Sequence, residues 1–245
     1  MAIIIRIEAE TKHYARITKW HIQRALRWIT AEDLQGLGCI RILDHESADP
    51  QASTQPPYLR GFVYLGHYYR KSDARLPEIH VFTKDLYYAI PKFLALSPIV
   101  TLEVATTIAH EVAHHLIELG HLSVASSTST KTSLDGRKPN PQEEAADSYA
   151  AAVVTRMLQT PYYKFGKIMA TGLSNIYFRL GLAAHKNANF KEAASLHYRA
   201  YIIDRDNDAA GQCYLRDRED MLSKTPSSLT DAERLWIYHR RAARR

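Results

Sequence analysis

Two histidines four positions apart, with a glutamate after the first, stand near the middle of this 245-residue chain as His110-Glu111-Val112-Ala113-His114. On a helix, residues i and i+4 lie about 40° apart around the axis and about 6 Å apart along it, so both imidazoles can reach one metal ion. Glu111 stands beside the first ligand, where its carboxylate could accept a proton from a water that zinc activates. The pattern predicts a zinc-dependent peptidase, with His110 and His114 as metal ligands and Glu111 as general base.

The segment that carries the motif, residues 101–119, has the features of a buried helix. It follows Pro98, ends at Gly120 and carries a wide apolar stripe at helical spacing. The alternative interpretation is that His110 and His114 are polar side chains packed in a buried helix, with no metal. The helical, buried context favours the metal site.

A catalytic zinc site needs a third protein ligand, and Glu143 is the strongest candidate. Glu143 and Asp147 fall at i and i+4 on one face of a second predicted helix, residues 141–158. The first carboxylate can bind zinc while Asp147 accepts the ring N–H of a ligand histidine and fixes its tautomer. Apolar neighbours such as Tyr149 argue against a merely solvated acidic face, because a carboxylate on a packed surface needs a partner.

Two other residues could serve as the third ligand. His121 would lie about 10 Å beyond His114 along an unbroken helix, and Glu118 lies one turn on from His114. Both spacings fit the metal less well than Glu143. Four side chains are nearby candidates for stabilising an oxyanion, with no basis for choosing among them: Tyr149, His121, Tyr162 and Tyr163.

The two motifs together, H-E-x-x-H at 110–114 and E-x-x-A-D at 143–147, resemble those of the gluzincin metallopeptidases. The separation of 33 residues between His110 and Glu143 is similar to that of the compact minigluzincins and the ImmA/IrrE-type proteins. The resemblance covers about residues 60–158. It implies a zincin-like domain with a small mixed sheet, an active-site helix and a glutamate helix. It also implies that a peptide substrate binds along an edge strand, for which Glu78–Phe82 stands in the matching place.

The remaining periodicity indicates an α+β fold. Helices are expected over 11–30 and 86–96, the second interrupted by Pro91, and strands over 38–44, 61–69 and 78–82. From about Ser174 the chain is expected to be helical in short pieces. We place the peptidase domain at residues 1–160 and an α-helical region at 161–245.

Part of this second region resembles one tetratricopeptide-type repeat. The matching positions are Leu180-Gly181, Ala193 and Ala200, while His197 and Arg205 replace the usual aromatic residue and proline. Helices over 208–223 and 229–244 are expected to cap this unit. It could dock a protein partner, or it could be a helical hairpin that packs on the first domain.

The composition fits a cytoplasmic protein without a membrane span. Only two cysteines are present, and the apolar start of the chain is too short for a signal peptide. The net charge is +6, and part of the excess lies in a basic tail at Arg240, Arg241, Arg244 and Arg245. This tail is a weak indication of nucleic-acid binding. The alternative to an enzyme is a zinc-containing interaction module or regulator that acts through its helical, basic C-terminus.

Overall fold

The computed structural model describes residues 3–7, 12–43, 65–70, 76–91, 94, 98–124 and 140–223. These residues form two compact units, of which the first ends at Ala170 and the second begins at Thr171. The predicted division, at 160/161, lies ten residues before this boundary. The architecture is α+β, as predicted. The predicted helix at 229–244, the basic tail and the loop at 45–58 lie outside the described residues.

A four-stranded mixed sheet forms one layer of the first unit. Its strands, in spatial order, are β1 (Ile4–Ile7), β2 (Cys39–Leu43), β4 (Glu78–Phe82) and β3 (Gly66–Tyr69). The first three are parallel, and β3 pairs antiparallel with β4. Alternate residues on one face are buried, as the two-residue period of a strand requires: Ile40, Ile42, Ile79 and Val81.

The expectation that Glu78–Phe82 is the edge strand was wrong. β4 is paired on both sides, by β2 and by β3, so its backbone is unavailable to a further strand. Among the described residues, β3 is the strand at this end of the sheet. The first strand, β1, was not predicted from the sequence. Four residues carry too little periodic signal, and the parallel pairing with β2 makes them a strand.

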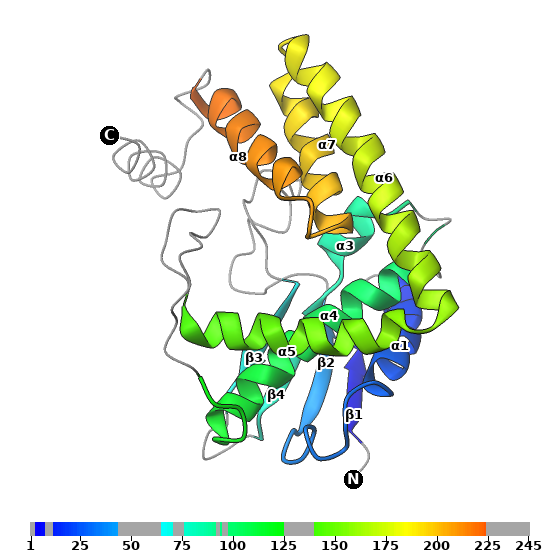
Figure 1. Cartoon of the computed structure of the whole chain (residues 1–245), viewed down its shortest axis with the longest axis vertical. Coiled ribbons are helices and arrows are strands. Elements are labelled where there is room, and N and C mark those ends of the chain that lie inside the picture. The colour runs from blue at the N-terminus through cyan, green and yellow to red at the C-terminus, as the bar shows by residue number, and fades with distance from the viewer. Residues whose placement is uncertain are drawn as a thin grey trace. The chain divides into compact units, whose positions relative to one another are not determined.

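Two helices of the first unit, α1 (Lys12–Leu26) and α4 (Pro98–Glu118), contact the sheet. The unit also contains α3 (Lys84–Ala89), α5 (Pro141–Leu158) and the beginning of α6 (Pro161–Lys186). Helix α4 contacts β3 and β4, and it also contacts α1 and α5. Figure 1 shows α5 lying across α4. The helix that carries the histidine motif is therefore held between the sheet and α5.

Local sequence explains where these helices begin and end. The Asn140 side chain accepts a hydrogen bond from the backbone N–H of Gln142 and caps α5, which starts with Pro141. Helix α3 stops two residues before Pro91, which cannot donate a backbone hydrogen bond. Helix α4 begins at Pro98, three residues before the predicted start. No helix within the described ranges is long and apolar enough to span a membrane.

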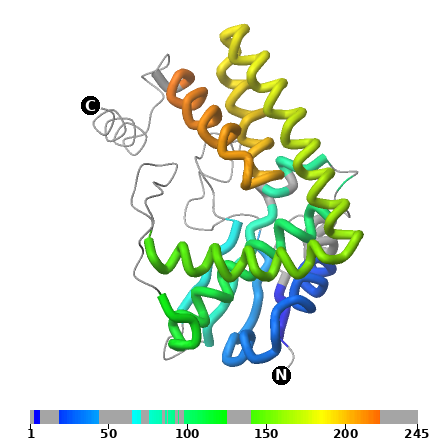
Figure 2. The backbone as a smooth tube through the Cα atoms, in the orientation of Figure 1, coloured from blue at the N-terminus to red at the C-terminus, as the bar shows by residue number. Residues whose placement is uncertain are grey.

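The second unit contains the rest of α6 together with α7 (Phe190–Ile203) and α8 (Asp208–Ser223). The expectation of short helical pieces from Ser174 was wrong at its start, because α6 runs unbroken for 26 residues. Figure 2 traces it as one continuous helix. At Gly181, an added Cβ would lie 2.5 Å from the His197 ring, so α6 and α7 approach closely where the glycine has no side chain.

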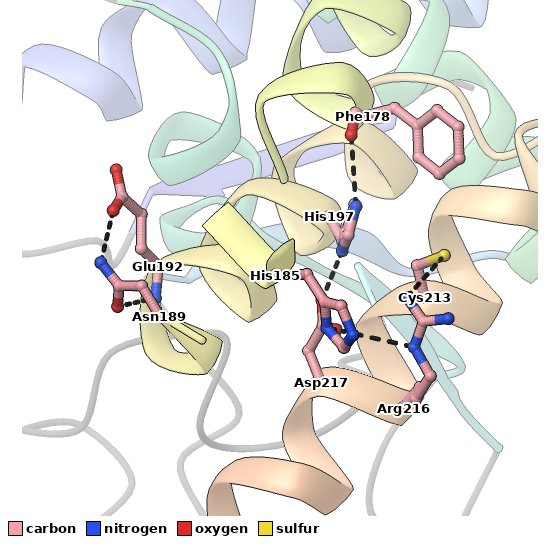
Figure 3. Close-up of polar contacts among 8 residues, drawn as sticks. All are labelled: Phe178, His185, Asn189, Glu192, His197, Cys213, Arg216 and Asp217. Carbon is pink, nitrogen blue, oxygen red and sulfur yellow. Dashed lines mark hydrogen bonds and ion pairs between the residues drawn. The ribbon is translucent and has the colours of Figure 1, made fainter. Parts of the chain in front are cut away.

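A buried carboxylate ties these three helices together (Figure 3). Asp217 on α8 has no exposed side-chain surface, and its oxygens lie 2.6 Å from His185 Nδ1 on α6 and 2.5 Å from His197 Nδ1 on α7. The other ring nitrogen of His197 donates to the Phe178 carbonyl at 3.2 Å. Every polar atom of the His197 ring is therefore paired with an acceptor, and the network stabilises the packing of α6, α7 and α8.

Replacing Asp217 by asparagine should lower the free energy of unfolding of this unit by about 2–4 kcal/mol, because two imidazoles lose a buried counter-charge. Urea unfolding followed by far-UV circular dichroism measures the change. The control is Asp208→Asn at an exposed position of the same helix. A change under about 0.5 kcal/mol at Asp217 would show that the network adds nothing to stability.

Candidate metal centre

Two imidazole nitrogens and the two oxygens of one carboxylate, from two helices, converge in the first unit. His110 Nε2 and His114 Nε2 on α4 lie 3.2 Å apart. On α5, Glu143 Oε2 lies 3.2 Å from His110 Nε2, and Glu143 Oε1 lies 3.6 Å from His114 Nε2. These residues form one of the two groups in the described chain whose donor atoms are close enough to hold a metal ion. The structure thus brings together the three ligands that the sequence proposed.

The spacing of these atoms fits zinc. A tetrahedral zinc ion holds nitrogen and oxygen donors at about 2.0–2.1 Å, which places neighbouring donors about 3.3 Å from one another. The separation of 3.2 Å between the two Nε2 atoms is close to one edge of that tetrahedron. The distances of 3.2 and 3.6 Å run to different oxygens of Glu143, so its carboxylate lies within reach of both imidazoles. Two imidazoles and one carboxylate are also a donor set that zinc takes in catalytic sites, with a fourth position left open.

Asp147 lies one helical turn beyond Glu143 and binds the far side of the His110 ring. Its Oδ1 is 3.0 Å from His110 Nδ1, so this nitrogen carries the proton and donates it to the carboxylate. A metal bound at Nε2 would replace the proton on that nitrogen, while Nδ1 stays bound to Asp147. Burial lowers the pKa of His110, but the hydrogen bonds with Asp147 and Glu143 outweigh it and raise the pKa to about 10. The two histidines hold the pKa of Glu143 well below its usual range.

Glu111, next to the first ligand, is almost fully buried at 7% exposure and lines the same cavity. Burial raises the pKa of its carboxyl above the usual value, while the charges of His110 and His114 and a hydrogen bond from the Tyr68 backbone N–H act in the opposite direction. The edge strand β3 therefore fixes the carboxylate through a backbone hydrogen bond. Glu111 is held beside the three donor atoms rather than among them.

Gly66 makes this close approach of β3 to α4 possible. A Cβ at this position would lie 2.6 Å from Thr107 Cγ2 and 3.2 Å from Glu111 Oε1. A larger residue would push the strand away from the helix or displace the carboxylate. The backbone conformation of Gly66 is one that other residues can adopt. The short distance to Thr107 and Glu111 is therefore the reason for a glycine here.

A cavity of about 560 Å³ opens over these groups. Its lining also includes residues that were not predicted to belong to the site, most of them on or beside β3: Gly66, His67, Tyr68, Arg70, Ile117 and Gln142. A strand was predicted at 61–69, but no sequence signal placed it next to α4. The pairing of β3 with β4 and its contact with α4 decide this placement.

His115, for which no role was predicted, links α4 to the strand β3. His115 Nε2 lies 2.9 Å from the Gln35 carbonyl, which can only accept, so this nitrogen donates. His115 Nδ1 then accepts from the Tyr68 hydroxyl at 3.0 Å. This chain of hydrogen bonds connects α4 to β3 beside the cavity.

The other candidates from the sequence lie apart from the donor atoms. Glu118 lines the cavity, but its Oε2 is 4.0 Å from Arg70 Nε. His121 is exposed beyond the end of α4 and does not line the cavity. The Tyr149 hydroxyl donates to Asp33 Oδ2 at 2.7 Å.

The remaining two tyrosines are occupied elsewhere in this unit. The Tyr163 ring packs edge-on against Trp28, and the Tyr162 ring lies beneath the Arg24 guanidinium. Neither lines the cavity. None of the three tyrosines is therefore in place to stabilise an oxyanion.

Comparison of the chain with protein-family models, with curated proteins and with solved structures finds no match.

Asp147→Ala should weaken zinc affinity about 10–100-fold, because the His110 ring loses the acceptor that fixes its tautomer. Competition with a chromophoric chelator measures the affinity. Glu144→Ala is the matched control, since Glu144 is the adjacent carboxylate on α5 and is not among the grouped donors. Equal affinities for the two variants would contradict the role given to Asp147.

Gly66→Ala should lower the free energy of unfolding by about 1–3 kcal/mol, because the new methyl group overlaps Thr107. Thr107→Ser removes the Cγ2 atom that it meets, so the double variant should recover part of the loss. Thermal and urea unfolding of the two single variants and the double variant measure the coupling. Additive effects of the two substitutions would show that the strand does not press on α4 at this point.

Proposed function

We propose that this chain is a zinc-dependent peptidase of the gluzincin type, with His110, His114 and Glu143 as metal ligands. The observation that carries the proposal is the convergence of His110, His114 and the Glu143 carboxylate between α4 and α5, with an Nε2–Nε2 separation close to that in a tetrahedral zinc site. The buried carboxylate of Glu111 in the same cavity is the second support. Zinc bound there would lower the pKa of a water molecule and polarise the carbonyl of a scissile peptide bond.

The role of Glu111 in this proposal is to move a proton. Its carboxylate takes the proton from the attacking water and delivers it to the leaving amine. The hydrogen bond from the Tyr68 N–H holds one face of the carboxylate, so that its other lone pairs can face the cavity. Asp147 keeps the proton of His110 on Nδ1, which orients the ring toward the donor cluster.

The edge strand β3 supplies a binding site for an extended peptide. The Phe82 N–H donates to the Leu65 carbonyl, so by the alternation of an antiparallel pair the backbone groups of Gly66 and Tyr68 point away from β4. The Tyr68 N–H is used by Glu111, and the other outward groups, which no described residue pairs with in the sheet, can bind a peptide added as a further strand. A peptide in that position runs along the cavity that contains Glu111.

The second unit belongs to the proposal as a tetratricopeptide-type repeat. The support is the contact of Gly181 with His197, in the register expected for the small residue of one helix against the large residue of the next. In this interpretation α6 and α7 form the repeat and α8 begins the cap. The same helices would then offer a surface for a protein partner.

Glu111→Gln should retain about one zinc per chain and lose peptide cleavage by at least about 100-fold, because the amide cannot accept the proton. Zinc content is measured by elemental analysis, and cleavage by incubation with unfolded protein substrates in the presence and absence of a chelator. Glu118→Gln changes the other carboxylate at the cavity and should retain most activity. Cleavage by Glu111→Gln would refute its role as the base, and zinc bound without any cleavage by the unmodified chain would favour an interaction module.

A further inference from the structure

Helix α6 carries a row of exposed apolar side chains along one face. The exposed fractions are 60% for Phe165, 63% for Ile168, 57% for Ile176 and 51% for Leu180. Because α6 is one continuous helix, spacings of three and four residues place them on the same face by the helical repeat alone. We call these four residues, together with Gly172 between them, the α6 stripe. Leaving such a row of apolar groups in water is unfavourable, and it marks a surface that binds something.

Gly172 is the second unusual feature of the stripe. A glycine inside a helix costs about 0.5–1 kcal/mol relative to alanine. Contacts with the described residues do not require it here, because a Cβ at Gly172 would meet none of their atoms within 4 Å, whereas at Gly166 and Gly181 it would be 2.5–2.6 Å from a neighbour. Gly172 lies at the middle of the exposed apolar row. The absence of a side chain there would let the backbone of a second helix approach α6 closely.

The stripe is nearly symmetric about this glycine. Ile168 and Ile176 each lie about 6 Å from Gly172 along the axis, and Phe165 and Leu180 lie about 10 and 12 Å away. A two-fold axis at Gly172 therefore places the first half of the stripe of one copy on the second half of the other. Such a self-complementary patch defines an isologous interface. We propose that a second copy of this chain binds here, with the two α6 helices crossing antiparallel at Gly172.

The charges next to the stripe favour the antiparallel arrangement. Arg179 is exposed and lies seven residues after Gly172, whereas Phe165 lies seven residues before it. In the antiparallel crossing the Arg179 guanidinium faces the Phe165 ring of the second copy, which is an attractive cation–π pair. A parallel crossing would instead place the two Arg179 side chains opposite each other, where they repel.

The area is sufficient for a weak dimer. The four exposed apolar side chains present on the order of 500 Å² per copy, so the pair would remove about 1,000 Å² from water, the lower limit for a specific interface. The dimer should therefore dissociate in the micromolar range and be concentration-dependent. This proposal does not depend on the peptidase activity, and the tests below do not measure it.

Sedimentation of the full chain over a series of concentrations tests whether it dimerises. Ile176→Glu should raise the dissociation constant at least about tenfold, because it places a carboxylate in the apolar contact. Leu76→Glu is the control, since Leu76 is similarly exposed at 54% but lies outside α6. A chain that stays monomeric at every concentration would overturn the proposal. In that case residues 224–245 or another protein would be the partner of the stripe. Equal effects of the two variants would overturn it as well.

Gly172→Gln separates a contact role from a structural one. Glutamine is a better helix former than glycine, and a Cβ here meets no atom of the described residues within 4 Å, so the monomer should melt at a higher temperature. The dimer should weaken, because the side chain holds the two helices apart. A variant that dimerises as strongly as the unmodified chain would contradict a crossing at this residue.

Cross-linking identifies the register. In a Cys213→Ser background, Gly172→Cys should form a disulfide-linked dimer on mild oxidation, because two residues at the axis lie within the roughly 7 Å Cα separation that a disulfide allows. Lys164→Cys is the control on the same helix. It lies about 12 Å from the axis and should not link to its own copy. Equal linking at the two positions would overturn the antiparallel crossing.

Discussion

The close packing of α4 against α5 is the constraint on which the candidate metal centre depends. The histidine pair lies on one helix and Glu143 on the other, so the imidazoles and the carboxylate come together only where the two helices pack closely. Both helices bury small residues, Ala109 and Ala113 on α4 and Ala146 and Ala150 on α5, and small side chains allow helices to approach closely.

The edge of the sheet is the second element that the site requires. β3 approaches α4 at Gly66, its backbone at Tyr68 binds Glu111, and the Tyr68 hydroxyl binds His115. Each contact uses a different part of the strand, so one short antiparallel strand fixes both the carboxylate and the wall of the cavity. This arrangement also leaves outward-facing backbone groups beside the carboxylate, which links the proposed substrate site to the proposed base.

Among the described residues, histidines and carboxylates form one cluster at the candidate metal centre and another in the second unit, and the two clusters suit different roles. At the candidate metal centre, the Nε2 atoms of His110 and His114 face each other and the Glu143 carboxylate, and the outer nitrogen of His110 is bound to Asp147. In the second unit, both ring nitrogens of His197 face acceptors, and both oxygens of Asp217 face histidines. The first cluster directs two imidazole nitrogens and a carboxylate at one another, which suits a metal ion. The second leaves no ring nitrogen of His197 unpaired and suits a structural role.

Features that depend on spacing within one segment could be predicted from the amino-acid sequence. The i, i+4 spacing of His110 and His114, the helix from Pro141 to Leu158 and the strand at Glu78–Phe82 are local properties, and the structure has these elements at those positions. Which segments meet depends on tertiary contacts. The strand order that makes β3 the edge, the pairing that makes Ile4–Ile7 a strand, and the unbroken course of α6 depend on contacts between distant residues. A local pattern carries no information about such partners, because the free energy that selects them comes from surfaces buried between segments.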